Sequence, residues 1–115
     1  MDLKNYLLEY VSSGRRKKNI PVEPDTVLKV GDIVRIRDEE WFDSLEKDSY
    51  GYGIVRYNGT TISFSPTMAK YLGCTVEIVE LSRKSGYPRY RVRLYNDGNS
   101  RELDDYVFSN EMLEY

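Results

Sequence analysis

The residues of this chain best suited to binding chemistry are arginines that occupy every second position in two segments, 34–37 and 89–94. Such alternation is typical of half-buried strands, in which the apolar side chains face the core and the charged side chains face outward. Guanidinium groups bind phosphate and stack on bases, so an outward arginine face is a candidate nucleic-acid surface. The candidate residues are Arg35, Arg37, Arg89, Arg91 and Arg93.

The overall charge leaves three alternatives open for these arginines. The formal net charge is -2 and the sequence pI is about 5.2, whereas dedicated nucleic-acid binders are usually basic. The arginines could form solvated ion pairs with Glu77 and Glu80 on a neighbouring strand, contact a protein, or contact nucleic acid. We predict nucleic acid only as an alternative partner.

Catalytic and metal chemistry has few candidates. The chain has no histidine and one cysteine, Cys74, so it lacks the usual general base and the usual zinc ligands. The acidic run Asp38–Glu40 lacks the spacing of a calcium loop. We therefore predict a non-enzyme with no cofactor, no metal and no small-molecule substrate.

The length and the terminal sequence predict the setting of the protein. At 115 residues, the chain has material for one domain core. No apolar run approaches the roughly 20 residues of a membrane span, and the N-terminus lacks the layout of a secretory signal. A single cysteine fits a reducing compartment. These features predict a cytoplasmic protein without membrane contact.

Residues 2–11 have the pattern of an amphipathic helix. Leu3, Tyr6, Leu7 and Tyr10 recur at the spacing of one helical face. A helix of about ten residues is too short to be stable alone in water, so this stripe must dock on its own domain or on a partner. We take the four residues as candidate protein-binding residues.

A basic run at 15–18 and two prolines follow the predicted helix. We expect residues 12–26 to form an extended linker. The predicted organisation is therefore an N-terminal helix and basic linker at 1–26, followed by a β domain at 27–115.

The remainder of the chain has the pattern of short strands separated by turns. Asn58-Gly59 between two β-rich runs is a strong hairpin signal. Residues 38–45 are expected to form a helical turn or a long loop, and residues 66–72 a short helical turn. With no long crossover helix, the pattern predicts a mainly β fold, most economically a small antiparallel barrel. The predicted strands are 30–37, 52–57, 60–64, 74–81, 89–95 and 106–108.

Four motifs carry a resemblance to a known group of proteins. They are GDIVRI at 31–36, MAKYLGCTVEI at 68–78, YRV at 90–92 and FSNEML at 108–113. Together they resemble the SH3-like small barrels found in proteins of bacterial phages and mobile elements. The N-terminal LKNYLLEYVSSG is similar to a leader in phage-like proteins of gut Bacteroidetes.

The resemblance implies an SH3-like fold and a bacterial host cell, and it transfers no catalytic residues. Where members of the group carry Trp before the final motif, this chain has Tyr106-Val107-Phe108. We predict a non-enzymatic protein-binding module encoded by a phage or mobile element. A nucleic-acid-binding small barrel that uses the arginine face is the alternative.

Overall fold

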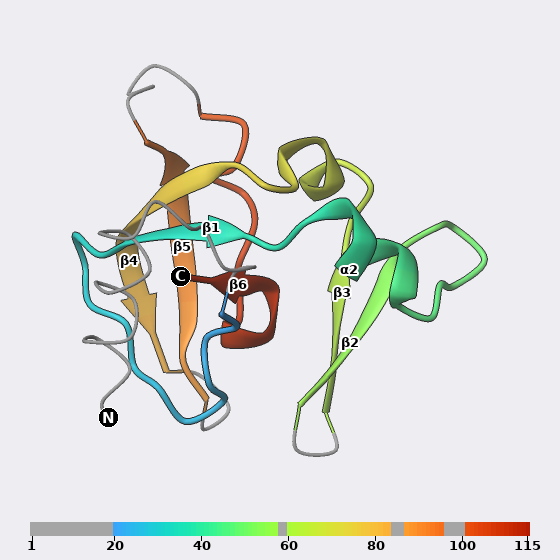
Figure 1. Ribbon diagram of the computed structural model, residues 1–115, viewed down its shortest axis with the longest axis horizontal. Coiled ribbons are helices and arrows are strands. Elements are labelled where there is room, and N and C mark those ends of the chain that lie inside the picture. Colours follow the sequence, from blue (N-terminus) through green and yellow to red (C-terminus); the bar gives the residue numbers. More distant parts are fainter. Residues whose placement is uncertain (1–19, 58–59, 84–86, 96–100) are drawn as a thin grey trace, which may run out of the picture.

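The computed structural model describes residues 20–57, 60–83, 87–95 and 101–115. The strands form two antiparallel sheets, a four-stranded sheet in the order β5-β4-β1-β6 and a hairpin of β2 and β3 (Figure 1). The strands are β1 (Ile33–Ile36), β2 (Gly53–Tyr57), β3 (Thr60–Phe64), β4 (Thr75–Ser82), β5 (Arg89–Leu94) and β6 (Leu113–Glu114).

Three short helical elements connect these strands. They are the α-helix α2 (Glu39–Ser44) and the 3-10 helices η1 (Met68–Tyr71) and η3 (Asn110–Met112). Asp38 caps α2, because its carboxylate accepts a hydrogen bond of 2.9 Å from the Trp41 backbone N–H. Helical turns are thus present at 38–45, where a long loop was the alternative, and at 66–72 as expected.

Strand β1 begins at Ile33 and not at residue 30 as predicted, because residues 29–32 form a tight turn. Gly31 has a φ of 98°, a conformation that favours glycine. The Lys29 backbone N–H donates to the Asp32 carboxylate at 2.8 Å. The predicted alternation is confirmed inside the strand, where Val34 and Ile36 are buried.

The predicted hairpin is confirmed. Tyr57 pairs with Thr60 and Gly53 pairs with Phe64, which leaves residues 58–59 as the two-residue connection. The mainly β, antiparallel character of the fold is likewise as expected.

The predicted small barrel is not closed in the part of the chain that the structure describes, because β2 does not pair with the four-stranded sheet. Backbone groups of β2 instead form hydrogen bonds with residues of the connection between α2 and β2. The Ile54 N–H donates to the Glu46 carbonyl at 2.8 Å, and Lys47 forms a β-bridge with Gly53. The hairpin therefore stands beside the four-stranded sheet (Figure 1).

The core lies between the inner side of the four-stranded sheet, the hairpin and the C-terminal segment. Phe64 reaches it from β3, with ring centroids 5.3 Å from Trp41 and 6.2 Å from Phe108. The buried core side chains are Val22, Leu28, Val34, Ile36, Val55, Phe64, Met68, Val76, Ile78, Tyr90, Val92, Leu103, Phe108, Met112 and Leu113.

The final strand begins later than predicted. Residues 106–108 are not a strand; Phe108 forms an isolated bridge with Tyr90, and β6 follows at Leu113. This bridge uses two backbone hydrogen bonds of 2.8 Å between Tyr90 and Phe108. The C-terminal segment thus crosses from β5 to β1.

Residues 20–26 of the predicted linker run beside the C-terminal strand. The Val22 N–H donates to the Leu113 carbonyl at 3.1 Å, and Val22 is buried. The Asn110 side-chain amide lies 2.9, 3.1 and 2.7 Å from the carbonyls of Glu23, Pro24 and Thr26. The predicted N-terminal helix and residues 12–19 lie outside the described residues, so the boundary at residue 26 stays a prediction.

Candidate functional site

The two arginine segments do not lie on neighbouring strands, as the continuous arginine face considered from the sequence would require. Strand β4 lies between them. The register aligns Ile33 of β1 with Glu77 of β4, and Glu77 with Arg93 of β5. Since adjacent strands are about 4.8 Å apart, β1 and β5 are separated by roughly 10 Å.

Arg35 and Arg37 therefore lie apart from the arginines of β5. Arg35 is half-buried and aligns with Thr75 and Glu114 on the neighbouring strands. Arg37 follows β1, and its guanidinium lies 5.4 Å from the centre of the Trp41 ring, within the range of a cation–π contact.

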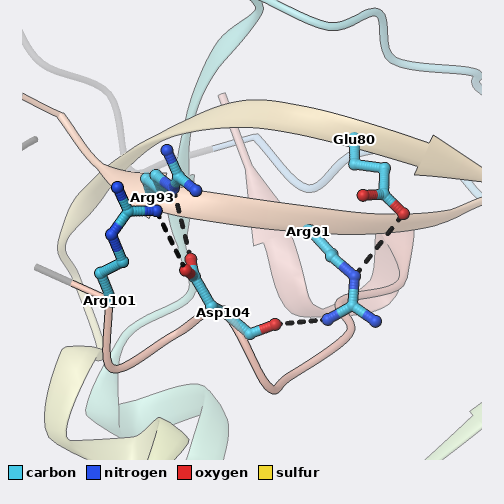
Figure 2. Close-up of polar contacts among 5 residues, drawn as sticks. All are labelled: Glu80, Arg91, Arg93, Arg101 and Asp104. Atoms are coloured by element: carbon cyan, nitrogen blue, oxygen red, sulfur yellow. Dashed lines mark hydrogen bonds and ion pairs between the residues drawn. The ribbon is translucent and has the colours of Figure 1, made fainter.

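Arg91 and Arg93 are held by acidic groups of their own chain. Figure 2 shows Arg93 and Arg101 converging on the Asp104 carboxylate, at 3.3 and 3.6 Å. Arg91 donates to the Asp104 backbone carbonyl and lies 3.6 Å from Glu80 (Figure 2). Partly exposed pairs of this kind contribute up to about 1 kcal/mol each. Their main effect is to orient the arginines and offset their charge.

Arg89 has a different environment from the other two arginines of β5. One guanidinium nitrogen donates to the Tyr87 hydroxyl at 2.6 Å, and the guanidinium carbon lies 4.7 Å from the centre of the Tyr87 ring. Its Nε is buried and has no hydrogen-bond partner within the described part of the chain. Arg89 is thus fixed on one side while one donor remains unused.

Two cavities flank Arg89. One, of about 260 Å³, lies along β4 and β5 and is lined by Glu80, Ser82, Arg89, Tyr90, Arg91 and Val107. The other, of about 270 Å³, lies between β3 and the start of β5. We call it the Arg89 cavity; its lining residues are Thr61, Ile62, Ser63, Tyr87, Arg89, Val107 and Ser109.

Ser109 lines the Arg89 cavity although only 2% of its surface is exposed. The bridge between Phe108 and Tyr90 places the following residue beside the start of β5. Ser109 occupies the N-cap position of η3, yet its side chain makes no capping hydrogen bond. Its hydroxyl is buried and finds no hydrogen-bond partner among the residues that the structure describes. A buried hydroxyl without a partner carries an uncompensated desolvation cost.

Tyr90 is a structural rather than a binding residue. Its hydroxyl accepts a hydrogen bond from the Leu28 N–H at 3.0 Å and lies 3.4 Å from the Thr26 carbonyl. Burial raises the pKa of Tyr90 above its usual value, while the hydrogen bond from Leu28 opposes this shift. The phenol therefore stays protonated and holds residues 26–28 on the sheet.

The predicted protein-binding residues at the N-terminus cannot be placed relative to the Arg89 cavity. Leu3, Tyr6, Leu7 and Tyr10 lie outside the described residues, so their predicted role in binding a protein stays a prediction. Within the described ranges, no three histidine, cysteine or acidic residues group in a way that could hold a metal ion. No helix in those ranges is long and apolar enough to cross a membrane.

Sequence reasoning found Arg89, with Tyr87 near the end of the arginine face, but missed Ser109 and the β3 residues that share its cavity. No local pattern brings β3 to the start of β5, because that approach depends on tertiary packing.

Comparison with known proteins gives no match. No matching protein-family model, curated protein or solved structure was found. The resemblance to SH3-like phage proteins therefore stays a prediction.

Proposed function

We propose that this protein is a non-enzymatic module that binds a protein partner. The observation that carries the proposal is the pairing of Arg91 and Arg93 with Glu80 and Asp104. Because these acids already offset the arginine charge, the surface offers a mixed charge pattern. A net charge of -2 adds no long-range attraction for a polyanion. Such a surface suits a protein better than a phosphate backbone.

The side of the four-stranded sheet that carries Arg93 has the composition of a protein interface. The register and the alternation along β1, β4 and β5 place apolar, aromatic, basic and acidic residues together there. Ile33 and Tyr95 are 45% and 47% exposed. Tyrosine and arginine are enriched in interfaces, where they act as anchors. We call this side the outer face; its residues are Ile33, Arg35, Thr75, Glu77, Arg93 and Tyr95.

The proposed module has a second predicted contact in the N-terminal stripe of Leu3, Tyr6, Leu7 and Tyr10. The basis of that contact is the sequence periodicity alone. Encoding by a phage or mobile element is likewise a proposal, which rests on the resemblance of the four motifs.

Affinity capture with the full chain tests the proposal. We expect wild-type protein to retain a specific protein from bacterial lysate after nuclease treatment. Tyr95→Asp should lower this capture at least tenfold, because it places a charge in the apolar part of the outer face. Tyr50→Asp is the matched control, since Tyr50 is 82% exposed and lies outside the outer face. Leu7→Asp tests the N-terminal stripe separately.

The same experiment separates the protein partner from nucleic acid. Capture that disappears with nuclease would contradict the proposal and favour the arginines as a nucleic-acid surface. Binding of a fluorescent oligonucleotide should then weaken steeply with salt, because each neutralised phosphate releases counterions. Equal capture by wild-type and Tyr95→Asp would remove the outer face as the interface.

A further inference from the structure

Two residues that line the Arg89 cavity each carry a buried polar atom without a hydrogen-bond partner in the described structure. The two atoms are Arg89 Nε and Ser109 Oγ. Buried polar groups in folded proteins nearly always have partners, so unsatisfied groups beside a cavity point to a missing ligand. An arginine N–H can only donate and a serine hydroxyl can donate, so the missing ligand is an acceptor.

The geometry of Arg89 narrows the class of acceptor. The Tyr87 hydroxyl and ring hold the guanidinium on one side, so its planar fork is fixed before a ligand arrives. A fixed guanidinium matches the two oxygens of a carboxylate. Ser109 supplies a further donor through rotation of its side chain into the cavity.

The charge inventory favours a carboxylate over a phosphate. Arg89 is the only basic residue that lines the cavity within the described part of the chain, so one positive charge meets the ligand. One guanidinium balances a monoanion but leaves a phosphate dianion with uncompensated charge, which is costly in a partly buried site. The half-buried Ile62 and Val107 provide an apolar wall for the remainder of the ligand.

We propose that the Arg89 cavity is a binding site for a carboxylate group attached to a small apolar body. Two sources share this chemistry, a free monocarboxylate and an acidic side chain of a peptide. The proposal goes beyond the proposed function, because the cavity residues are not those of the outer face. If binding fails at either the Arg89 cavity or the outer face, the other site can still be tested.

Titration of the full chain with matched small probes, followed by NMR of the backbone amides, tests the site. Sodium benzoate supplies a carboxylate on an apolar body, and benzamide supplies the same body without the charge. Phenyl phosphate supplies the competing oxyanion, and the peptide acetyl-Ala-Glu-Ala-amide supplies a side-chain carboxylate. We expect saturable shifts at Arg89 and Ser109 with benzoate or with the peptide, and none with benzamide. Whichever of benzoate and the peptide binds more tightly identifies the source of the carboxylate.

Variants of the two unsatisfied donors provide the second readout. Ser109→Ala should weaken carboxylate binding about tenfold, as expected for the loss of a hydrogen bond to a charged group. Its melting temperature should stay equal to wild type or rise, because the lost hydroxyl had no partner. Arg89→Lys keeps the charge but loses the planar fork and should also bind at least tenfold more weakly. Arg56→Gln is the matched control, since Arg56 is exposed, lies outside the outer face and lines neither cavity.

Three results would overturn the proposal. One is the absence of saturable shifts with both carboxylate probes at concentrations up to tens of millimolar. Another is binding of phenyl phosphate at least tenfold tighter than that of benzoate, which would assign the site to phosphate. The third is unchanged carboxylate affinity in Ser109→Ala and Arg89→Lys when both variants remain folded.

Discussion

The four-stranded sheet and the β2–β3 hairpin are stabilised in different ways. In the sheet, each of β1, β4 and β5 buries two side chains at alternate positions, so apolar contacts are spread over many residues. In the hairpin, Val55 and Phe64 are the buried side chains among those that the structure describes. The sheet should therefore tolerate single changes, whereas the hairpin should depend on Phe64.

The largest expected effect comes from removing that aromatic anchor. Phe64 contacts Trp41 and Phe42 in α2 and Phe108 in the C-terminal segment. Phe64→Ala should lower the free energy of unfolding by about 3–5 kcal/mol, through lost transfer energy and a cavity. Denaturation in urea, followed by fluorescence of Trp41, measures the change.

The matched change in the four-stranded sheet is Val92→Ala. Val92 is fully buried, and the loss of its two methyl groups should cost about 2 kcal/mol. Equal costs for the two substitutions would contradict the difference between the sheets. A smaller cost for Phe64→Ala than for Val92→Ala would reverse the expected difference between the hairpin and the four-stranded sheet.

A second prediction concerns the close packing of the hairpin against the loop that follows α2. A Cβ at Gly53 would lie 2.8 Å from Leu45 Cδ1 and 3.2 Å from Phe42 Cε1. Because the end of the leucine side chain can move, Gly53→Ala should cost only about 1–2 kcal/mol. The added substitution Leu45→Val should recover part of that loss, and a double-mutant cycle from urea denaturation measures the coupling.

Gly31→Ala is the control for this packing effect. Gly31 has open space around it but a φ of 98°, so its cost of about 1 kcal/mol comes from backbone strain. Leu45→Val should not change that cost. Additive effects at Gly53 and Leu45 would show that the loop does not restrain β2.

The elements predicted from the sequence are those with a strong local pattern. The alternation at 34–37 and 89–94 and the Asn58-Gly59 turn located β1, β5 and the hairpin within a few residues. The way these elements associate was not predictable, because it depends on contacts between distant residues. The hydrogen bond from the Ile54 N–H to the Glu46 carbonyl occupies a backbone group of β2 that could otherwise pair with another strand, and no local pattern encodes it.

The same distinction applies to the candidate site. Alternation placed the arginines of β5 on one side, and pairing across strands with Glu80 was among the alternatives considered. The role of Asp104 and the approach of Ser109 to Arg89 depend on the path of residues 101–109. That segment has turns and an isolated bridge rather than a periodic element, so its position follows from tertiary packing.

The smallest expected effect concerns a polar contact within the four-stranded sheet. Tyr90→Phe removes the acceptor of the Leu28 N–H and should cost about 1 kcal/mol at neutral pH.

Burial holds the pKa of Tyr90 above the value of about 10 in the unfolded chain. The folded state therefore keeps this proton when the unfolded state loses it, and stability falls as the pH rises above about 10. Phenylalanine has no such proton, so the advantage of wild type over Tyr90→Phe should shrink between pH 9 and 11. Urea denaturation of both proteins across this range measures the difference, in which the titration of the other tyrosines cancels. A constant difference across this pH range would show that burial of Tyr90 does not shift its ionisation.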